Sequence, residues 1–492
     1  MSEWLAFCDS LDLGAVVPER FERYRPAILH GIAHFLANLA PERTVEILAA
    51  QADLPEDAGP HERLVAIARQ CPALHKLGQV LARDRRLPLQ LRLLLQHLES
   101  MQASQPRTDI MAALERELGP LAALGITVDA GPIAEASVAV VVPVRWTDDA
   151  AHERRGVMKV LKPGIEARLE EELALLQQVG ALLDDRCHQY GLPEIAYEAT
   201  FARVRELLSL EVDLRREQAH LVRARADYAK LKTVIVPELH PFCTARLTAM
   251  ERIDGRKVTE VASLTAKARR RLAHVIVEAL IARPIWARGP DAMFHADPHA
   301  GNLLATDDGR IGILDWSLVG HLSKDDRVNL SQILTGAMTA DPGAIVQAVT
   351  GLAGGAVDGA VLEKVVRTHL AGRGSRPWPG LSWLVDLMDD VVTKARAHFR
   401  ADLLAFRKVL QTLEGVIADV SEECHPDVVL AASFLRRLAL EWGSRMVSSP
   451  FSREFGTHLS NADLAYLLMF APTAAWAQQV RVHLAGDDDP AA

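Results

Sequence analysis

Residues 1–130 have the apolar periodicity of amphipathic helices. Apolar residues recur three and four positions apart through residues 22–39 and again through residues 61–84, which predicts a helix in each segment. Residues 53–60 are rich in proline, glycine and acidic residues and are interpreted as the loop before the second helix. Gly78 lies inside that second helix, where glycine costs about 1 kcal/mol relative to alanine. We therefore expect either a close backbone contact or a break in the helix at that point.

From residue 131 the apolar pattern changes to that of β-strands. Residues 137–146 and 155–162 are rich in valine, which predicts two antiparallel strands joined by a polar loop. Lys159 lies in the second strand between Met158 and Val160. A lysine flanked by apolar residues on a strand is typical of the kinase lysine that contacts the α and β phosphates of ATP. The alternative is a lysine on an edge strand, turned to solvent.

Helical periodicity returns after these strands. Two long helices are predicted over residues 164–190 and 195–228, followed by short strands within 233–239 and 245–253. The second helix carries Glu211, Asp213 and Glu217. These three acids cannot share one helical face, because positions two residues apart point in different directions. After residue 320 the chain is again predicted to be helical.

The clearest chemical signal is a polar stretch in the middle of the chain. His295, Asp297 and Asn302 follow the pattern H-x-D-x-x-x-x-N, and Asp315 ends a short apolar strand that follows. In protein kinases an aspartate lies beside the acceptor hydroxyl, an asparagine binds Mg²⁺, and a second aspartate joins Mg²⁺ to the phosphates. The 13 positions from Asn302 to Asp315 leave room for a hairpin. The non-catalytic alternative is a polar loop between two helices.

Composition narrows the class of protein. The 492 residues carry a formal net charge of −9, which argues against a globally basic nucleic-acid-binding protein. The five cysteines are scattered and include no C-x-x-C pair, so neither a zinc site nor a disulfide framework is indicated. We expect no signal peptide and no membrane-spanning helix, because the first residues lack a basic and apolar leader and the chain has no long apolar run. The expected location is cytoplasmic, with peripheral contact on the inner face of a membrane as an option.

Four separated segments resemble the UbiB/AarF family of atypical protein-kinase-like ATPases. Residues 75–79 are similar to the K-x-G-Q helix of that family, and residues 132–137 are similar to its alanine-rich loop, which stands where other kinases have a glycine-rich loop. Residues 211–213 resemble its E-x-D motif, and residues 294–302 resemble its catalytic loop. Together these segments extend over residues 71–320.

The resemblance implies an α+β fold of the two-lobed protein-kinase type, with a small mixed β-sheet lobe and a helical large lobe. It also implies three parts of the chain. Residues 1–130 would form a helical N-terminal extension over the active site, carrying the K-x-G-Q motif. Residues 131–254 would form the N-lobe, and residues 255–492 the helical C-lobe with the catalytic loop and the C-terminal helices.

The resemblance also implies a role for each candidate site residue, with ATP and Mg²⁺ as cofactors. Those implied for nucleotide binding are Ala134, Ala136, Ser137, Lys159 and Glu217. Asn302 and Asp315 would hold Mg²⁺, and Asp297 would take the position of the catalytic base. Lys76 would reach Glu211 and close the space where a protein substrate normally lies.

The function that follows is ATP hydrolysis or phosphoryl transfer linked to isoprenoid quinone or other lipid biosynthesis. The implied partners are a lipid or quinone precursor or proteins of lipid biosynthesis, with peripheral membrane contact and no nucleic acid. A small-molecule phosphotransferase and a nucleotide-binding pseudokinase that regulates a partner are the alternatives. The K-x-G-Q segment argues against the first, and the set Lys159, Asp297, Asn302 and Asp315 argues against the second.

The chain departs from kinase patterns at several positions. Ala296 replaces the arginine of the kinase loop, and Ser317 stands where the second metal-binding segment usually has glycine, which predicts less backbone freedom there. Glu135 places a carboxylate in the loop expected to face phosphates. Residues 464–480 are apolar, but Pro472 interrupts them and they are too short to span a bilayer. We expect this segment to lie on a surface or to pack on the core.

Overall fold

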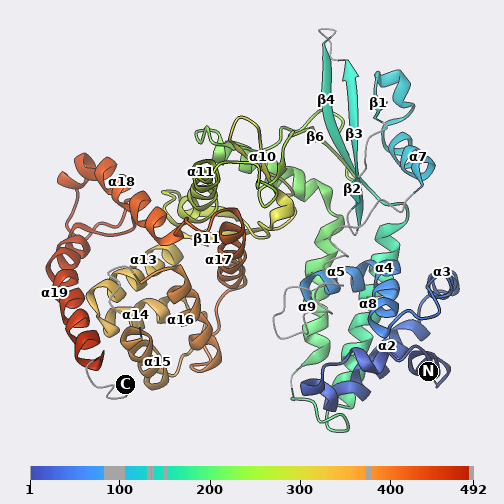
Figure 1. Cartoon of the computed structure of the whole chain (residues 1–492), viewed down its shortest axis with the longest axis horizontal. Helices are drawn as coiled ribbons and strands as arrows, with labels where there is room; N and C mark the ends of the chain where they lie inside the picture. The colour runs from blue at the N-terminus through green and yellow to red at the C-terminus, as the bar shows by residue number, and fades with distance from the viewer. Residues whose placement is uncertain are drawn as a thin grey trace. The chain divides into compact units, whose positions relative to one another are not determined.

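The computed structural model describes residues 2–81, 106–129, 134–135, 138–147, 152–194, 196–372 and 379–486. Its internal contacts divide the chain into two compact units (Figure 1). The first unit comprises Met1–Ala219 and Glu238–Arg252, and the second comprises His220–Pro237 and Ile253–Ala492. The division falls inside helix α10 (Leu214–Tyr228). The three-part organisation expected from the sequence stays a prediction.

Helices form the N-terminal part of the first unit. They are α1 (Ser2–Ser10), α2 (Arg25–Ala37), α3 (Pro41–Ala52), α4 (Pro60–Gln70), α5 (Pro72–Leu81) and α7 (Arg107–Leu118). The helix predicted within residues 22–39 is confirmed as α2, but the single helix predicted over 61–84 is wrong. It breaks at Cys71, which has an extended backbone with φ −117° and ψ 102°. The residue before a proline avoids the helical conformation, and Pro72 starts the next helix, where its missing N–H costs nothing.

The sheet of the first unit is built around the two valine-rich strands, β3 (Ala139–Thr147) and β4 (Glu153–Leu161). They pair antiparallel, as predicted, and form the long hairpin in Figure 1. β1 (Thr127–Val128) and β2 (Ala134–Glu135) both pair with β3, and β6 (Leu247–Glu251) pairs with the other side of β4. β4 is therefore a central strand of this sheet.

Two long helices follow β4 in the first unit. α8 (Ile165–Asp185) and α9 (Tyr197–Ser209) lie side by side in Figure 1. The prediction of one helix over residues 195–228 is wrong, because a 3₁₀ turn at Leu210–Val212 separates α9 from α10. Asp213 leaves the helical conformation, and its Oδ1 accepts a hydrogen bond of 3.2 Å from the backbone N–H of Arg216. Aspartate is a preferred residue at such a helix start, so α10 begins there in a new direction.

The second unit contains two small sheets. One has the strand order β5 (Val234–Ile235), β10 (Ile311–Ile313), β9 (Leu303–Ala305) and β7 (Arg256–Lys257), and the other pairs β8 (Asp291–His295) with β11 (Val319–Ser323). The predicted hairpin after Asn302 is confirmed as β9 and β10. Gly309 in its turn has φ +79°, which glycine adopts without steric cost. The strand predicted within 233–239 is reduced to two residues, and it pairs in parallel with β10.

The rest of the second unit is helical. Its helices are α11 (Ala266–Val277), α12 (Arg283–Ile285), α13 (Lys324–Thr339), α14 (Pro342–Leu352), α15 (Gly359–Ala371), α16 (Leu381–Thr393), α17 (Ala401–Val420), α18 (Pro426–Met446) and α19 (Asn461–Gly486), with a π-helical turn at Glu278–Ala282 after α11. Fully buried aromatic side chains, among them Trp286, Phe294 and Phe406, contribute to the core of the second unit. A sheet lobe together with this large helical part confirms the predicted kinase-like α+β class. In the part of the chain that the structure describes, no helix is both long enough and apolar enough to cross a membrane.

Candidate active site

A buried ion pair marks the predicted nucleotide-binding part of the first unit. Lys159 lies in the middle of β4, opposite Val141 of β3 and Thr248 of β6, so it is not on an edge strand. Its Nζ donates to both carboxylate oxygens of Glu217 at 2.9 Å, and both side chains are buried. A buried charge is costly unless it is paired in this way. Two predicted site residues that are 58 positions apart in the sequence thus lie in contact.

The helix that carries Glu217 is anchored to the same sheet by the next residue. The side-chain amide of Gln218 donates to the backbone oxygens of Thr244 and Leu247 at 2.9 and 3.1 Å, and to the hydroxyl of Thr248 at 3.1 Å. Thr248 is the neighbour of Lys159 across the β4–β6 pair. These bonds fix the start of α10 relative to β4, so the position of the Glu217 carboxylate is set by the backbone of the sheet.

Lys76 and Glu211 form a second ion pair in the first unit, with 3.0 Å between Nζ and Oε1. Their side chains are 23% and 10% exposed, so this pair is less buried than the Lys159 pair. Lys76 comes from α5, and Glu211 comes from the 3₁₀ turn between α9 and α10. The turn separates Glu211 from Glu217, and each acid meets a different lysine. The structure therefore joins the K-x-G-Q segment to the E-x-D segment.

Sequence reasoning missed the two residues that hold α5 in place. The carboxylate of Glu172, which is fully buried on α8, accepts a hydrogen bond of 2.8 Å from the backbone N–H of Ala73 in the first turn of α5. Its other oxygen accepts from Nη2 of Arg43 at 2.7 Å, and that guanidinium also donates to the carbonyl of Gln70. Burial raises the pKa of Glu172 to about 7, although both donors favour its charged form. The signal in the sequence was a glutamate on the apolar stripe of α8, directly before the buried Leu173.

The stretch of residues 295–320, which holds the predicted catalytic and metal-binding residues, begins where β8 ends. The ring of His295 is buried, and its Nδ1 accepts the backbone N–H of Asp297 at 3.2 Å. Its Nε2 lies 2.9 Å from the carbonyl oxygen of Leu314, so Nε2 carries the proton. Burial lowers the pKa of His295, which keeps the ring in this neutral form. His295 thereby joins the Asp297 loop to the strand end that precedes Asp315.

The β9–β10 hairpin places Asn302 and Asp315 at the same end. Leu303 pairs with Ile313, and the backbone N–H of Leu314 donates to the carbonyl of Asn302 at 2.8 Å. The side-chain amide of Asn302 donates to the carbonyl of Asp297 at 3.1 Å. The three predicted residues of the second unit therefore share one small backbone framework.

This framework fits a magnesium ion in its donor chemistry. Because the amide nitrogen of Asn302 is engaged with Asp297, the oxygen of that amide is its atom available for a cation. Mg²⁺ prefers oxygen ligands and is usually held by one or two carboxylates together with substrate phosphates. Within the described residues no group of three His, Cys, Asp or Glu side chains is arranged around a metal position. Asn302 and Asp315 match a site that phosphates complete.

The segment Asp315–Trp316–Ser317 differs from the sequence expectation. Asp315 itself has a left-handed backbone with φ +51°, whereas Ser317 is not among the residues with positive φ. Glycine is therefore not required at position 317. Aspartate tolerates the left-handed region better than most residues, and such conformations cluster at functional sites. The backbone N–H of Ser317 donates to Oδ1 of Asp315 at 3.2 Å, which stabilises the turn.

Trp316 anchors this turn in the core of the second unit. Its side chain is fully buried, and its indole N–H donates to the carbonyl of Ile313 at 3.2 Å. The ring packs edge-on against His295 with 4.9 Å between ring centroids. The backbone carbonyl oxygen of Trp316 lies 3.0 Å from Nδ1 of His220, a residue in the part of α10 that belongs to the second unit. A larger aromatic ring thus fills the position that phenylalanine has in most kinases.

Two side chains that the sequence did not identify, a lysine and a histidine, lie near Asp297. Nζ of Lys408, on α17, is 3.7 Å from one carboxylate oxygen, and Nε2 of His299 is 3.7 Å from the other. Gly301 allows this loop to fold tightly, because a Cβ at that position would be 2.8 Å from the His299 ring. Lys408 is remote from the motif in sequence, so only the packing of α17 could reveal it.

The alanine-rich loop is described only in part. Ala136 and Ser137 lie outside the described residues. Ala134 and Glu135 form β2, with Ala134 opposite Val141, and their side chains are also outside the description. The predicted roles of these residues, and the predicted effect of the Glu135 carboxylate, stay predictions.

Comparisons with known proteins bear on the family of this chain. The family model described as "ABC1 atypical kinase-like domain" matches residues 97–349, about half of the chain. "Probable protein kinase UbiB" of Xanthomonas campestris pv. campestris is 33% identical over 230 residues, which cover 44% of this chain and 40% of the relative. An Arabidopsis thaliana protein, "Uncharacterized aarF domain-containing protein kinase At5g05200, chloroplastic", is 31% identical over 226 residues, covering 44% of this chain and 40% of that protein.

The matched region covers 40% of the length of each of these two curated relatives, so the chain spans well under two thirds of either one. Among solved structures, "The complex structure of Rv3197-erythromycin from Mycobacterium tuberculosis" aligns with a TM-score of 0.48 and 17% sequence identity, over 77% of this chain and 94% of that one. The family model matches half of the chain, and the K-x-G-Q, E-x-D and catalytic-loop segments lie in the arrangement described above. The chain belongs to the UbiB/AarF family of atypical kinases, with an ABC1 atypical kinase-like domain.

Proposed function

We propose that this chain is a Mg²⁺-dependent enzyme that hydrolyses ATP or transfers its γ-phosphoryl group in isoprenoid quinone or other lipid biosynthesis. The observation that carries the proposal is the buried Lys159–Glu217 pair, in which both carboxylate oxygens hold the lysine at 2.9 Å. Protein kinases use this pair to position the phosphates of ATP. If Lys159 and Glu217 had only a structural role, apolar residues in their place would stabilise the fold at least as well.

The charged and polar residues described above take the following roles in this proposal. Lys159 contacts the ATP phosphates, and Glu217 holds its ammonium group in place. Asn302 and Asp315 hold Mg²⁺, which when bound neutralises the charge of the phosphate oxygens. Asp297 orients the attacking oxygen and accepts its hydrogen bond. His295 positions Asp297, because its ring nitrogen accepts the Asp297 backbone N–H.

In hydrolysis, a water oxygen forms a bond to the γ-phosphorus while the bond from that phosphorus to the β–γ bridging oxygen breaks. The products are phosphate and ADP, and the proton of the water passes through the Asp297 carboxylate to solvent. In phosphoryl transfer, an acceptor hydroxyl takes the place of water. The Lys76–Glu211 contact supports hydrolysis over transfer to a freely diffusing small molecule, because it ties down the K-x-G-Q segment that is expected to restrict the acceptor space.

Nucleotide binding tests this proposal directly. Mg-ATP should raise the thermal stability of the protein, because a ligand that binds only the folded state stabilises it. Lys159→Ala should abolish most of the shift, and Asp315→Asn should remove its Mg²⁺-dependent part. Arg155→Ala is the matched control, since it removes an exposed cation from the same strand. If saturating Mg-ATP gives no shift and calorimetry detects no binding, the enzyme proposal is wrong.

The pathway and the location belong to the same proposal. We place the protein at the cytoplasmic face of a membrane in peripheral contact, with a lipid or quinone precursor, or proteins that make one, as its partner. High salt or carbonate should then release it from membranes. ATP turnover with and without lipid vesicles measures the lipid dependence, and recovery that requires detergent after such a wash would contradict peripheral contact.

A further inference from the structure

The end of α18 has its charges on the inside. Residues 438–452 contain two charged side chains, Glu441 and Arg445, and both are buried, with 1% and 4% exposure. Nη2 of Arg445 lies 2.8 Å from Oε2 of Glu441, one helical turn earlier. The exposed positions of this segment are all uncharged. A surface helix in water normally has the opposite polarity, with its charges outside.

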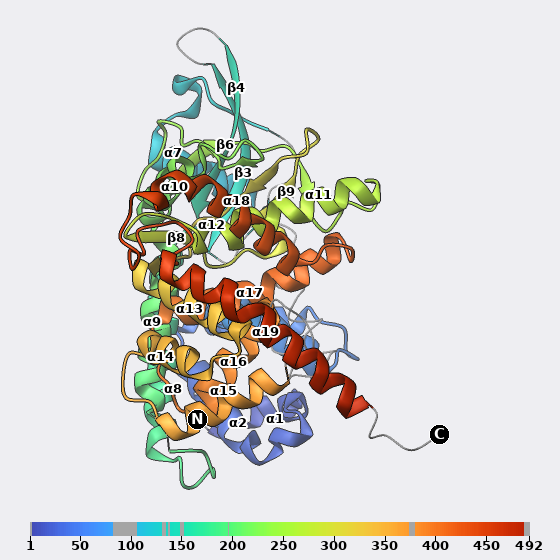
Figure 2. The same cartoon turned by 90° about the vertical axis from the view of Figure 1, so that its left-hand side faces the viewer.

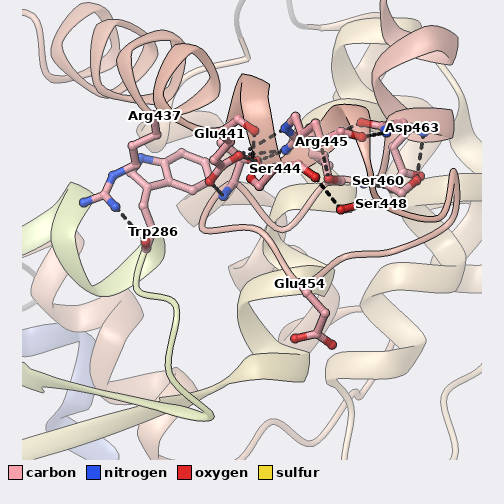
Figure 3. Close-up of polar contacts among 12 residues, drawn as sticks. Trp286, Arg437, Glu441, Ser444, Arg445, Ser448, Glu454, Ser460 and Asp463 are labelled. Carbon is pink, nitrogen blue, oxygen red and sulfur yellow. Dashed lines mark hydrogen bonds and ion pairs between the residues drawn. The ribbon is translucent and has the colours of Figure 1, made fainter.

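A polar network fixes this orientation. Thr457 donates its backbone N–H and its hydroxyl to the two oxygens of Glu441 at 3.1 and 2.8 Å. Arg445 donates to the carbonyl of Leu459 and to the side chain of Asn461, at the start of α19. Figure 3 shows Glu441 and Arg445 joined by these contacts, with Ser460 and Asp463 beside them. Rotating the helix to expose its charges would break every one of these bonds.

The consequence is an exposed apolar surface formed by α18, the following loop and α19. We call it the α18–α19 apolar surface and define it by Trp442, Met446, Val447, Phe451, Leu468 and Trp476, which are between 66% and 88% exposed. The start of α19 packs against the loop, because the backbone N–H of Ala462 donates to the carbonyl of Pro450 at 2.9 Å. Both helices are at the left of Figure 1 and face the viewer in Figure 2.

Residues 464–476 of α19 continue this surface without a single charged residue. Large apolar side chains that cluster in the open mark a binding surface, because each one favours removal from water by roughly tenfold or more. Bulky aromatic and thioether side chains that project from a helix end and a loop suit the interfacial region of a bilayer.

The charges at the rim indicate which surface is complementary. Three ion pairs border or underlie the apolar surface, and in each the arginine is exposed by 42% to 62% while the acid is exposed by 1% to 24%. These pairs are Arg288–Glu441, Arg436–Glu278 and Arg453–Asp463. At the rim the guanidinium groups are therefore more exposed than the carboxylates they pair with. Glu454, which pairs with Lys324, is an exposed acid there. A second copy of the chain would bring these arginines against each other, whereas anionic lipid headgroups attract them.

We propose that the α18–α19 apolar surface binds an anionic lipid bilayer, with its apolar side chains in the interface and the rim arginines at the headgroups. The surface involves none of the residues assigned to ATP chemistry. Its occupancy is measured by lipid binding, and the proposed enzymatic function is measured by nucleotide binding and turnover. Failure of one is therefore distinguishable from failure of the other.

Vesicle co-sedimentation of the full-length chain tests the proposal. Vesicles of phosphatidylcholine with phosphatidylglycerol should bind the protein more tightly than phosphatidylcholine alone. The double variant Trp442→Ser/Phe451→Ser should lose roughly 100-fold in partitioning. Val45→Ser is the matched control, because Val45 on α3 is 64% exposed and belongs to the first unit. Glu454→Gln removes the exposed rim acid and should strengthen binding to the anionic vesicles.

A second measurement locates the contact. Lipids with brominated acyl chains should quench tryptophan emission of the wild type, and Trp442→Leu should reduce this quenching while keeping vesicle affinity within a few fold. The proposal is overturned if the wild type binds neither vesicle type, or if the double variant binds as well as the Val45 control. It is equally overturned if the double variant converts an oligomer to a monomer without changing vesicle binding, since the surface would then serve a second copy.

Discussion

The buried contact that holds α5 allows the sharpest stability prediction. Glu172 has no exposed surface, and its carboxylate joins Arg43 at 2.7 Å to the backbone N–H of Ala73 at 2.8 Å. Replacing Glu172 by glutamine keeps the size of the side chain and an oxygen that can accept from Ala73. It removes the negative charge, so the guanidinium of Arg43, which is 5% exposed, loses its closest anion.

The expected loss follows from the charges that remain. Removing one partner of a buried ion pair costs about 3–5 kcal/mol. Glu46 and Glu171 stay within 3.3 and 4.0 Å of the guanidinium of Arg43 and compensate part of its charge. We therefore expect Glu172→Gln to lower the free energy of unfolding of the first unit by at most about 3 kcal/mol, the lower end of that range, because the burial that raises the pKa of Glu172 already opposes its charged form. Replacing both partners, as in Arg43→Met/Glu172→Leu, should recover most of the loss, because no buried charge is then left unpaired.

The assay has to resolve one unit of a chain that need not unfold in a single step. Amide hydrogen exchange of the peptides from α5 and α8, followed by mass spectrometry at increasing urea, reports the local free energy of opening. The measurement belongs at pH 8, where Glu172, with its pKa raised to about 7 by burial, is ionised in the wild type. Glu171→Gln is the control. The carboxylate of Glu171 is 29% exposed and should contribute less than about 1 kcal/mol to the free energy of unfolding.

Two results would refute this reasoning. If Glu172→Gln changes the opening free energy by no more than the Glu171 control, the buried pair does not hold α5. If the double replacement is as unstable as the single one, the loss comes from packing and not from an unpaired charge.

Three further predictions concern the site and its surroundings. Lys76→Ala should leave nucleotide affinity within a few fold of wild type but change the rate of ATP turnover, because Lys76 contacts Glu211 and not a phosphate; unchanged turnover, or an affinity loss as large as in Lys159→Ala, would show that it has another role. Lys408→Met should reduce kcat for ATP hydrolysis by about tenfold, since a half-exposed cation 3.7 Å from Asp297 contributes modestly, whereas Lys408→Arg should keep most of the rate; equal rates in both variants would exclude an electrostatic role. His458 is buried, its Nε2 donates to the carbonyl of Ile285, and its Nδ1 has no hydrogen-bond partner among the described residues, so burial lowers its pKa from 6.5 to about 4. Because the folded-state pKa lies below the unfolded one, the contribution of His458 to stability is complete above pH 6.5 and falls by about 3 kcal/mol as the pH decreases to 4. Asparagine tolerates the positive φ of this position, so His458→Asn should flatten the pH dependence of the free energy of urea unfolding in that range. An unchanged pH dependence would contradict this prediction.

The arrangement of the predicted site residues in the second unit could be predicted from the sequence because their interactions are local. His295, Asn302 and Asp315 lie within one β-strand end and the hairpin that follows, and the turn residues of that hairpin determine its register. The effect of Ser317 was not readable, because the residue with the unusual backbone conformation is Asp315. A pattern of residue types specifies which side chains occupy a loop, but not which peptide unit takes the strained conformation.

The sequence also identified the lysines and acids of the two ion pairs, but the helix break between the two acids determined which lysine each acid contacts. On one continuous helix over residues 195–228, the acids at positions 211 and 217 would have followed a single helical spacing. The break at Leu210–Val212 places Glu211 on a turn and Glu217 on a new helix, so one meets Lys76 and the other Lys159. A helix break in a segment that contains no glycine or proline is hard to predict from sequence, because its position depends on what the two helices pack against.

Only the tertiary structure revealed the contacts made by charged residues inside apolar elements. Glu172 and Glu441 lie in helices whose periodicity predicts nothing about which helix faces them, and each is buried because a distant arginine or backbone donor meets it. Lys408 approaches Asp297 for the same reason, from a helix far along the chain. Periodicity determines that one face of a helix is buried. Which partner covers that face, and whether the exposed face is apolar as on α18, depends on packing between segments that are remote in sequence.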